Sequence, residues 1–127
     1  MTQKDKELLL KDLCARLPYR PKVKVLHIWN EEKGVEEDIV DTVYCVFPEG
    51  YINTETIVSD MPLNDNIVLY LRPMSSMTEE EYQEFGYDAL RYTPREFDWL
   101  NEHHFDYRGL IERGLALEAP DDMYKTE

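Results

Sequence analysis

Hydrophobic positions near the start of the chain recur at helical spacing. The apolar positions are Leu9, Leu10, Leu13 and Leu17. Spacings of three and four place side chains on one side of a helix. Thr2 followed by Asp5 resembles a helix start, and Pro18 stops the run. These signals predict an amphipathic helix over residues 3–16.

The apolar period falls to two from residue 22 onward. Alternation over 22–29 and the β-branched run 39–47 predict two strands, with a polar segment containing Gly34 between them. Residues 51–58 and 66–71 predict two more. Four strands in about fifty residues favour a small antiparallel sheet over 22–71, for which an SH3-like barrel is one possible form.

Helix-start signals dominate the last third of the chain. Two are capping boxes, Thr78 with Glu81 and Thr93 with Glu96. Asp106 is predicted to begin a third short helix that ends at Gly114. We therefore expect two to three short helices over 78–114 and a flexible tail over 120–127. The whole chain, 1–127, is predicted to form a single α+β domain.

The charge balance is strongly acidic. The 127 residues include 27 acidic and 14 basic side chains, which gives a formal charge of −13. This charge disfavours direct binding to nucleic acid or to an anionic membrane, and it is compatible with a cationic partner. No apolar run reaches membrane-spanning length, and the three N-terminal leucines are too few for a signal peptide. The expected location is the cytoplasm.

Two cysteines, Cys14 and Cys45, are too far apart in the sequence for a CxxC motif. A zinc ribbon or a thioredoxin-like site is thereby excluded. We predict two buried free thiols and no cofactor.

The densest acidic block invites a functional interpretation. Its members are Glu31, Glu32, Glu36, Glu37, Asp38 and Asp41. Such a block can be a solvated loop, a face that binds a protein, or an imitation of nucleic-acid phosphates that occupies a DNA-binding protein. A hairpin centred at Lys33–Gly34 would also place His27 near Asp41, as a cross-strand pair.

A metal-binding site near the helix predicted to begin after Thr93 is a further alternative for the function of the chain. Asp98 and Glu102 lie four positions apart on a predicted helix, next to His103, and could serve a metal-dependent hydrolase. However, His103 and His104 point about 100° apart on a helix, and no HExxH motif is present. We predict a structural role for these residues, no metal ligands and no catalytic residues.

Three stretches resemble a known family. They are KELLLKDLCARLPY (6–19), YLRPMSSMTEEE (70–81) and FDWLNEHHFDYRGLIERGLALEAP (97–120). They are similar to an uncharacterised family of small proteins from gut Bacteroidales, such as Bacteroides, whose genes often lie near phage or mobile elements. The resemblance covers about half the chain and leaves out 22–69. It implies a bacterial cytoplasmic setting and an accessory role, but no functional residues, because the family has no established activity.

Together these observations predict a non-enzymatic interaction or regulatory module with a protein partner. In the third stretch, Arg108 has no evident structural duty, and an ion pair with nearby acids is its expected role. The candidate contact residues are the six acids of the block together with Trp99, His103 and Arg108. An acidic face, or the aromatic and methionine-rich junction between sheet and helices, would meet the partner.

Overall fold

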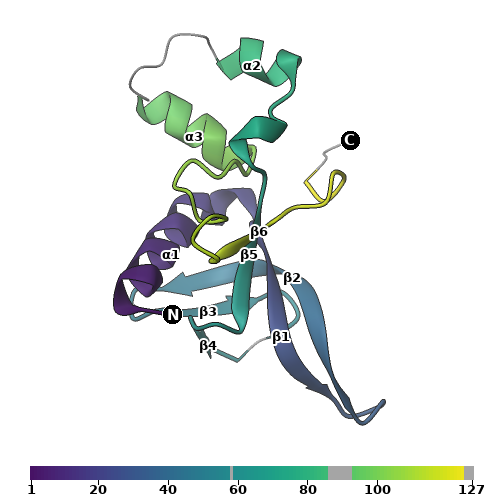
Figure 1. Ribbon diagram of the computed structural model, residues 1–127. Coiled ribbons are helices and arrows are strands. Elements are labelled where there is room, and N and C mark those ends of the chain that lie inside the picture. The colour runs from purple at the N-terminus through teal and green to yellow at the C-terminus, as the bar shows by residue number, and fades with distance from the viewer. Residues whose placement is uncertain (58, 86–92, 125–127) are drawn as a thin grey trace.

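The computed structural model describes residues 1–57, 59–85 and 93–124 (Figure 1). The helical elements are α1 (Gln3–Arg16), η1 (Leu17–Tyr19), η2 (Met74–Ser76), α2 (Glu79–Phe85) and α3 (Pro94–Glu102). The strands are β1 (Lys22–Asn30), β2 (Val35–Phe47), β3 (Tyr51–Thr54), β4 (Met61–Pro62), β5 (Ile67–Leu71) and β6 (Ala116–Glu118). The α+β class is confirmed. None of the described helices combines the length and apolarity needed to cross a membrane.

The six strands form one open sheet in the order β4-β3-β2-β1-β5-β6. Neighbouring strands are antiparallel except β5 and β6, which are parallel. The sheet is therefore mixed, whereas the sequence predicts an antiparallel one. The SH3-like barrel is not formed, because closure would require the two end strands to pair, and these contain only two and three residues.

Helix α1 covers one face of the sheet (Figure 1). It has the predicted bounds, and a capping box between Thr2 and Asp5 starts it. Leu9 and Leu13 are fully buried in the same core cluster as Val23 and Leu69 of the sheet. The predicted burial of both thiols is wrong: Cys14 lies on the exposed side of α1, and Cys45 is half-buried.

The buried side of α1 also contains an ion pair. Arg16 donates to both carboxylate oxygens of Asp12, from Nε at 2.7 Å and from Nη2 at 3.1 Å, and neither side chain is exposed. Arg16 also donates to the backbone oxygen of Phe105 at 2.6 Å. Arg108 donates from Nε to Asp12 at 3.0 Å. These bonds tie the N-terminal helix to the segment that follows α3.

The third predicted helix is not formed. Asp106 does accept backbone hydrogen bonds from Leu110 and Ile111, as a helix cap would, at 2.8 and 3.0 Å. However, Gly109 adopts a left-handed φ of 73°, which takes the backbone out of the helical conformation. Residues 110–114 form turns instead. Residues 86–92 of the predicted helical stretch lie outside the described residues.

The last described residues fold back onto the sheet. The tail over 120–127 is predicted to be flexible, and of it 125–127 lie outside the described residues. The Tyr124 hydroxyl accepts from the backbone N–H of Lys22 at 2.8 Å and donates to the oxygen of Tyr70 at 2.7 Å. Its ring stacks on the imidazole of His104, with centroids 3.6 Å apart. Burial raises the pKa of the Tyr124 hydroxyl.

Candidate functional site

Strands β1 and β2 extend beyond the rest of the sheet as a two-stranded hairpin, called the arm below (residues 27–40). Strand β5 pairs with β1 only from Val23 to Val25, and β3 pairs with β2 only from Val43 onward. Figure 1 shows the arm projecting at the opposite end of the molecule from α2 and α3. Most of the acidic block therefore lies on paired strands and their turn, not in a loop.

Local sequence explains how the arm closes. The Gly34 N–H donates to the Asn30 oxygen at 2.8 Å, and Gly34 has a left-handed φ of 66°. The Asn30 side-chain oxygen accepts from the backbone N–H of Lys33 at 3.2 Å. Asparagine and glycine supply this turn because the first bonds its own backbone and the second tolerates positive φ.

A β-bulge in β1 changes the register of the arm. The pairing shifts between Val25 and Ile28, and His27 has a φ of 60°. The His27 N–H donates to Asp38 Oδ1 at 3.3 Å, and its Nδ1 lies 3.2 Å from Glu36 Oε2. The predicted pair of His27 with Asp41 is wrong, because Asp41 lies opposite Val23. Bulges increase strand twist and re-aim the side chains that follow.

Large apolar side chains are exposed along the arm. Trp29 is 59% exposed, Val40 50% and Val35 48%. Trp29 lies opposite Glu36, and Val40 lies opposite Lys24. Exposed apolar groups surrounded by charge are typical of interaction surfaces, and tryptophan carries more binding energy than most residues there. The sequence analysis does not include Trp29 among the candidate contact residues. Its position next to the acidic block in the sequence could have identified it as one.

Five of the six acids of the predicted block lie on the arm. Glu31 and Glu32 are exposed in the turn. Glu37 accepts from Asn30 at 2.8 Å and lies 3.5 Å from Lys33, and the Asn30 bond lowers the pKa of Glu37. Asp38 lies 3.8 Å from Lys24. These contacts leave the arm with an excess of negative charge.

Asp41, the sixth acid, is a structural residue. It is buried and accepts from the Thr54 hydroxyl at 2.7 Å and from the backbone N–H groups of Thr42 and Thr56. Burial alone would raise the pKa of Asp41, but these hydrogen bonds outweigh it and hold the pKa below its ordinary value. A surface contact through Asp41 is thus disfavoured by its burial.

Replacing Asp41 by alanine is expected to lower the free energy of unfolding by about 2 kcal/mol, because buried donors lose their acceptor. Replacing the exposed Glu31 by alanine is the matched control and should leave stability close to that of the unmodified protein. Urea unfolding followed by circular dichroism measures both. Equal effects of the two substitutions would contradict the structural role of Asp41.

The other three candidates lie away from the arm. Trp99 stacks on Phe105, with centroids 5.8 Å apart, and also contacts the rings of Phe85 and His103. Arg108 makes its expected ion pair with Asp12, and this acid is buried in the core. Trp99 therefore packs among other rings and Arg108 pairs with a buried carboxylate, and the structure does not bring either of them together with the acidic block.

His103 adjoins a strong ion pair at the junction of sheet and helices. Arg72 donates to both oxygens of Glu81 at 2.7 Å and lies 4.1 Å from the centre of the Phe105 ring. The Arg72 hydrogen bonds, against the opposing effect of burial, lower the pKa of Glu81 to about 2. His103 Nδ1 lies 3.8 Å from Glu81. The predicted junction is thus held by packing and charge.

The metal alternative gains no support from geometry. Asp98 and Glu102 are exposed on α3. Across the described ranges 1–57, 59–85 and 93–124, no group of three or more His, Cys, Asp or Glu side chains is arranged to hold a metal ion.

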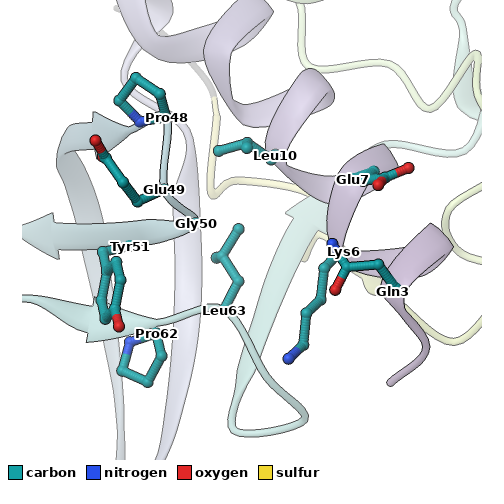
Figure 2. Close-up of a pocket in the computed structure, with 10 residues that line it drawn as sticks. All are labelled: Gln3, Lys6, Glu7, Leu10, Pro48, Glu49, Gly50, Tyr51, Pro62 and Leu63. Carbon is teal, nitrogen blue, oxygen red and sulfur yellow. The ribbon is translucent and has the colours of Figure 1, made fainter.

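A hollow of about 390 Å³ lies between α1, the turn after β2 and strand β4 (Figure 2). Leu10 and Leu63 contribute apolar walls, and Lys6 and Glu7 bring opposite charges from α1. Figure 2 shows Tyr51 beside Pro62, its partner in the β3–β4 register. Mixed charge and a modest apolar lining do not define one ligand chemistry, so the arm is the stronger candidate.

Comparison of the chain with protein-family models, with curated proteins and with solved structures gives no match.

Proposed function

We propose that this protein is a non-enzymatic interaction module whose arm binds a cationic surface of a partner protein. The exposure of Trp29 on the projecting arm carries the proposal. A partner pocket that received the indole would bury a large apolar ring at little entropic cost, because tryptophan has few rotatable bonds. The surrounding acids would select a basic rim and accelerate the encounter.

The cellular setting is part of the same proposal. The resemblance to Bacteroidales proteins supports a cytoplasmic accessory role linked to phage or mobile elements. The partner is then another bacterial protein, and recognition requires neither a cofactor nor a metal.

Replacing Trp29 by alanine is expected to weaken capture of the partner by about 30-fold, because a central tryptophan is typically worth about 2 kcal/mol or more. Tagged protein would be incubated with lysate of a bacterium that encodes it, and bound proteins identified by mass spectrometry. Dissociation constants for the recovered partner would then be measured by calorimetry.

Tyr44 provides the matched control. It is 70% exposed on β2, in the part of the strand that faces β3 and not on the arm. Tyr44→Ala should bind as the unmodified protein does. If Trp29→Ala binds normally while Glu31→Lys with Glu32→Lys abolishes binding, charge alone drives recognition, as in a nucleic-acid mimic, and the proposal is wrong.

A further inference from the structure

Along the arm, no described strand pairs with the outer edge of β2. Pairing of β2 with β3 extends only to Val43. After β3, the Glu55 N–H donates one hydrogen bond to the Thr42 oxygen, and the Thr56 N–H donates one to the Asp41 side chain. From Val35 to Val40, within the part of the chain that the structure describes, β2 pairs with β1 alone. An unpaired strand edge offers its backbone N–H and C=O groups to another strand.

The side chains along this edge determine which strand can bind. Glu36, Glu37 and Asp38 are consecutive, with the exposed Val35 and Val40 on either side. A second copy of this chain would place like charges opposite one another, and such pairs are destabilising. Side chains alternate along β2, so Glu36 and Asp38 share one face and Val35 and Ile39 share the other. An extended segment in which lysine or arginine alternates with small apolar residues would place its basic side chains beside the two acids and its apolar side chains beside Val35 and Ile39.

The acids of the arm are available to such a partner. Their present ion pairs, Asp38 with Lys24 and Glu37 with Lys33, span 3.8 and 3.5 Å and involve partly exposed side chains. Exposed pairs of this kind contribute little stability, so exchanging them for contacts with a bound strand costs little. Glu36 lies beside His27 on the same surface.

We propose that the β2 edge from Val35 to Val40 binds a basic, extended peptide segment as an additional β-strand. This inference rests on the proposed function of the arm and specifies the partner's chemistry and geometry. Backbone hydrogen bonds would supply affinity, and the alternating side chains of the segment would supply specificity.

Backbone methylation of a probe peptide tests strand addition directly. The probe is a fluorescein-labelled octapeptide in which lysine alternates with valine or threonine, measured by fluorescence anisotropy at low salt. In a second peptide every lysine carries an N-methyl group on its backbone nitrogen. In a third peptide every valine and threonine carries one instead. Successive backbone groups of a strand point to opposite edges, so only one methylated peptide should lose affinity, by about tenfold or more.

The protein variants locate the peptide on the arm. Glu36→Lys should weaken binding of the unmodified peptide about tenfold, whereas Glu112→Lys, an exposed acid in the 110–114 turns, should not. If both methylated peptides bind like the unmodified one, strand addition is wrong. The proposal that the arm binds its partner through side chains would be unaffected by that result. If no peptide binds, or Glu36→Lys has no effect, the inference is also overturned, while capture of the native partner separately tests the proposed function.

Discussion

Replacing Asp12 by alanine is expected to lower the free energy of unfolding by about 3–5 kcal/mol, among the largest effects of any single substitution in this protein. Asp12 accepts two hydrogen bonds from Arg16 and one from Arg108, and the Asp12 and Arg16 side chains are fully buried. Without the carboxylate, the Arg16 charge would remain in the core, and among the described residues the Phe105 oxygen would be its remaining hydrogen-bond acceptor. Urea denaturation gives the change directly.

A double substitution distinguishes the lost ion pair from lost packing. Asp12→Leu together with Arg16→Met removes both charges and keeps most of the volume, so it should recover much of the stability lost in Asp12→Ala. If the double variant is less stable than Asp12→Ala, the unpaired Arg16 charge is not the cause of the lower stability of Asp12→Ala. Cys14→Ala, on the exposed side of the same helix, should leave the free energy of unfolding almost unchanged.

Stability should fall as the pH is lowered from 7.5 to 5.0, and His104 should account for about 2 kcal/mol of the loss. Burial, with smaller contributions from Arg16, His103, Arg72 and Lys22, lowers the pKa of His104 to about 3. The unfolded chain binds a proton near pH 6.5, whereas the folded chain does not until about pH 3. The unfolded state is therefore favoured progressively over this interval.

His104→Asn is the variant that isolates this contribution. Asparagine tolerates the left-handed φ of 64° at this position and has no titrating group in the interval. The variant should be less stable at pH 7.5, because stacking on Tyr124 is lost, but its stability should depend less on pH. Urea unfolding at half-unit pH steps measures both slopes. Parallel slopes for the two proteins would show that His104 is not responsible.

Local signals in the sequence predict a helix boundary well where a single residue determines where the helix begins or ends. The capping box at Thr2 and the proline at position 18 delimit α1 because they act on neighbouring backbone groups. The third helix fails for an equally local reason. Asp106 caps the turn as predicted, but Gly109 adopts a backbone conformation that a helix excludes.

Pairing between distant segments could not be predicted from the sequence. The pattern indicates a buried face on α1, but nothing local shows that Asp12 and Arg16 share that face and neutralise each other there. The sequence indicates a hairpin at Lys33–Gly34, but its second strand is predicted to begin only at residue 39, because three consecutive acids at 36–38 are unusual in a strand. Pairing with β1 outweighs that weak preference and extends β2 back to Val35.

The parallel pairing of β5 with β6 has a consequence for synthesis of the chain. Leu69 and Leu71 are buried, and their neighbours on one side are Ala116 and Glu118, near the end of the sequence. During translation, the edge of β5 therefore stays unpaired until both helices and the turns after them have left the ribosome. Ribosome-bound chains that stop before residue 116 should expose the unpaired, aggregation-prone edge of β5 and bind chaperones more strongly than chains that include β6.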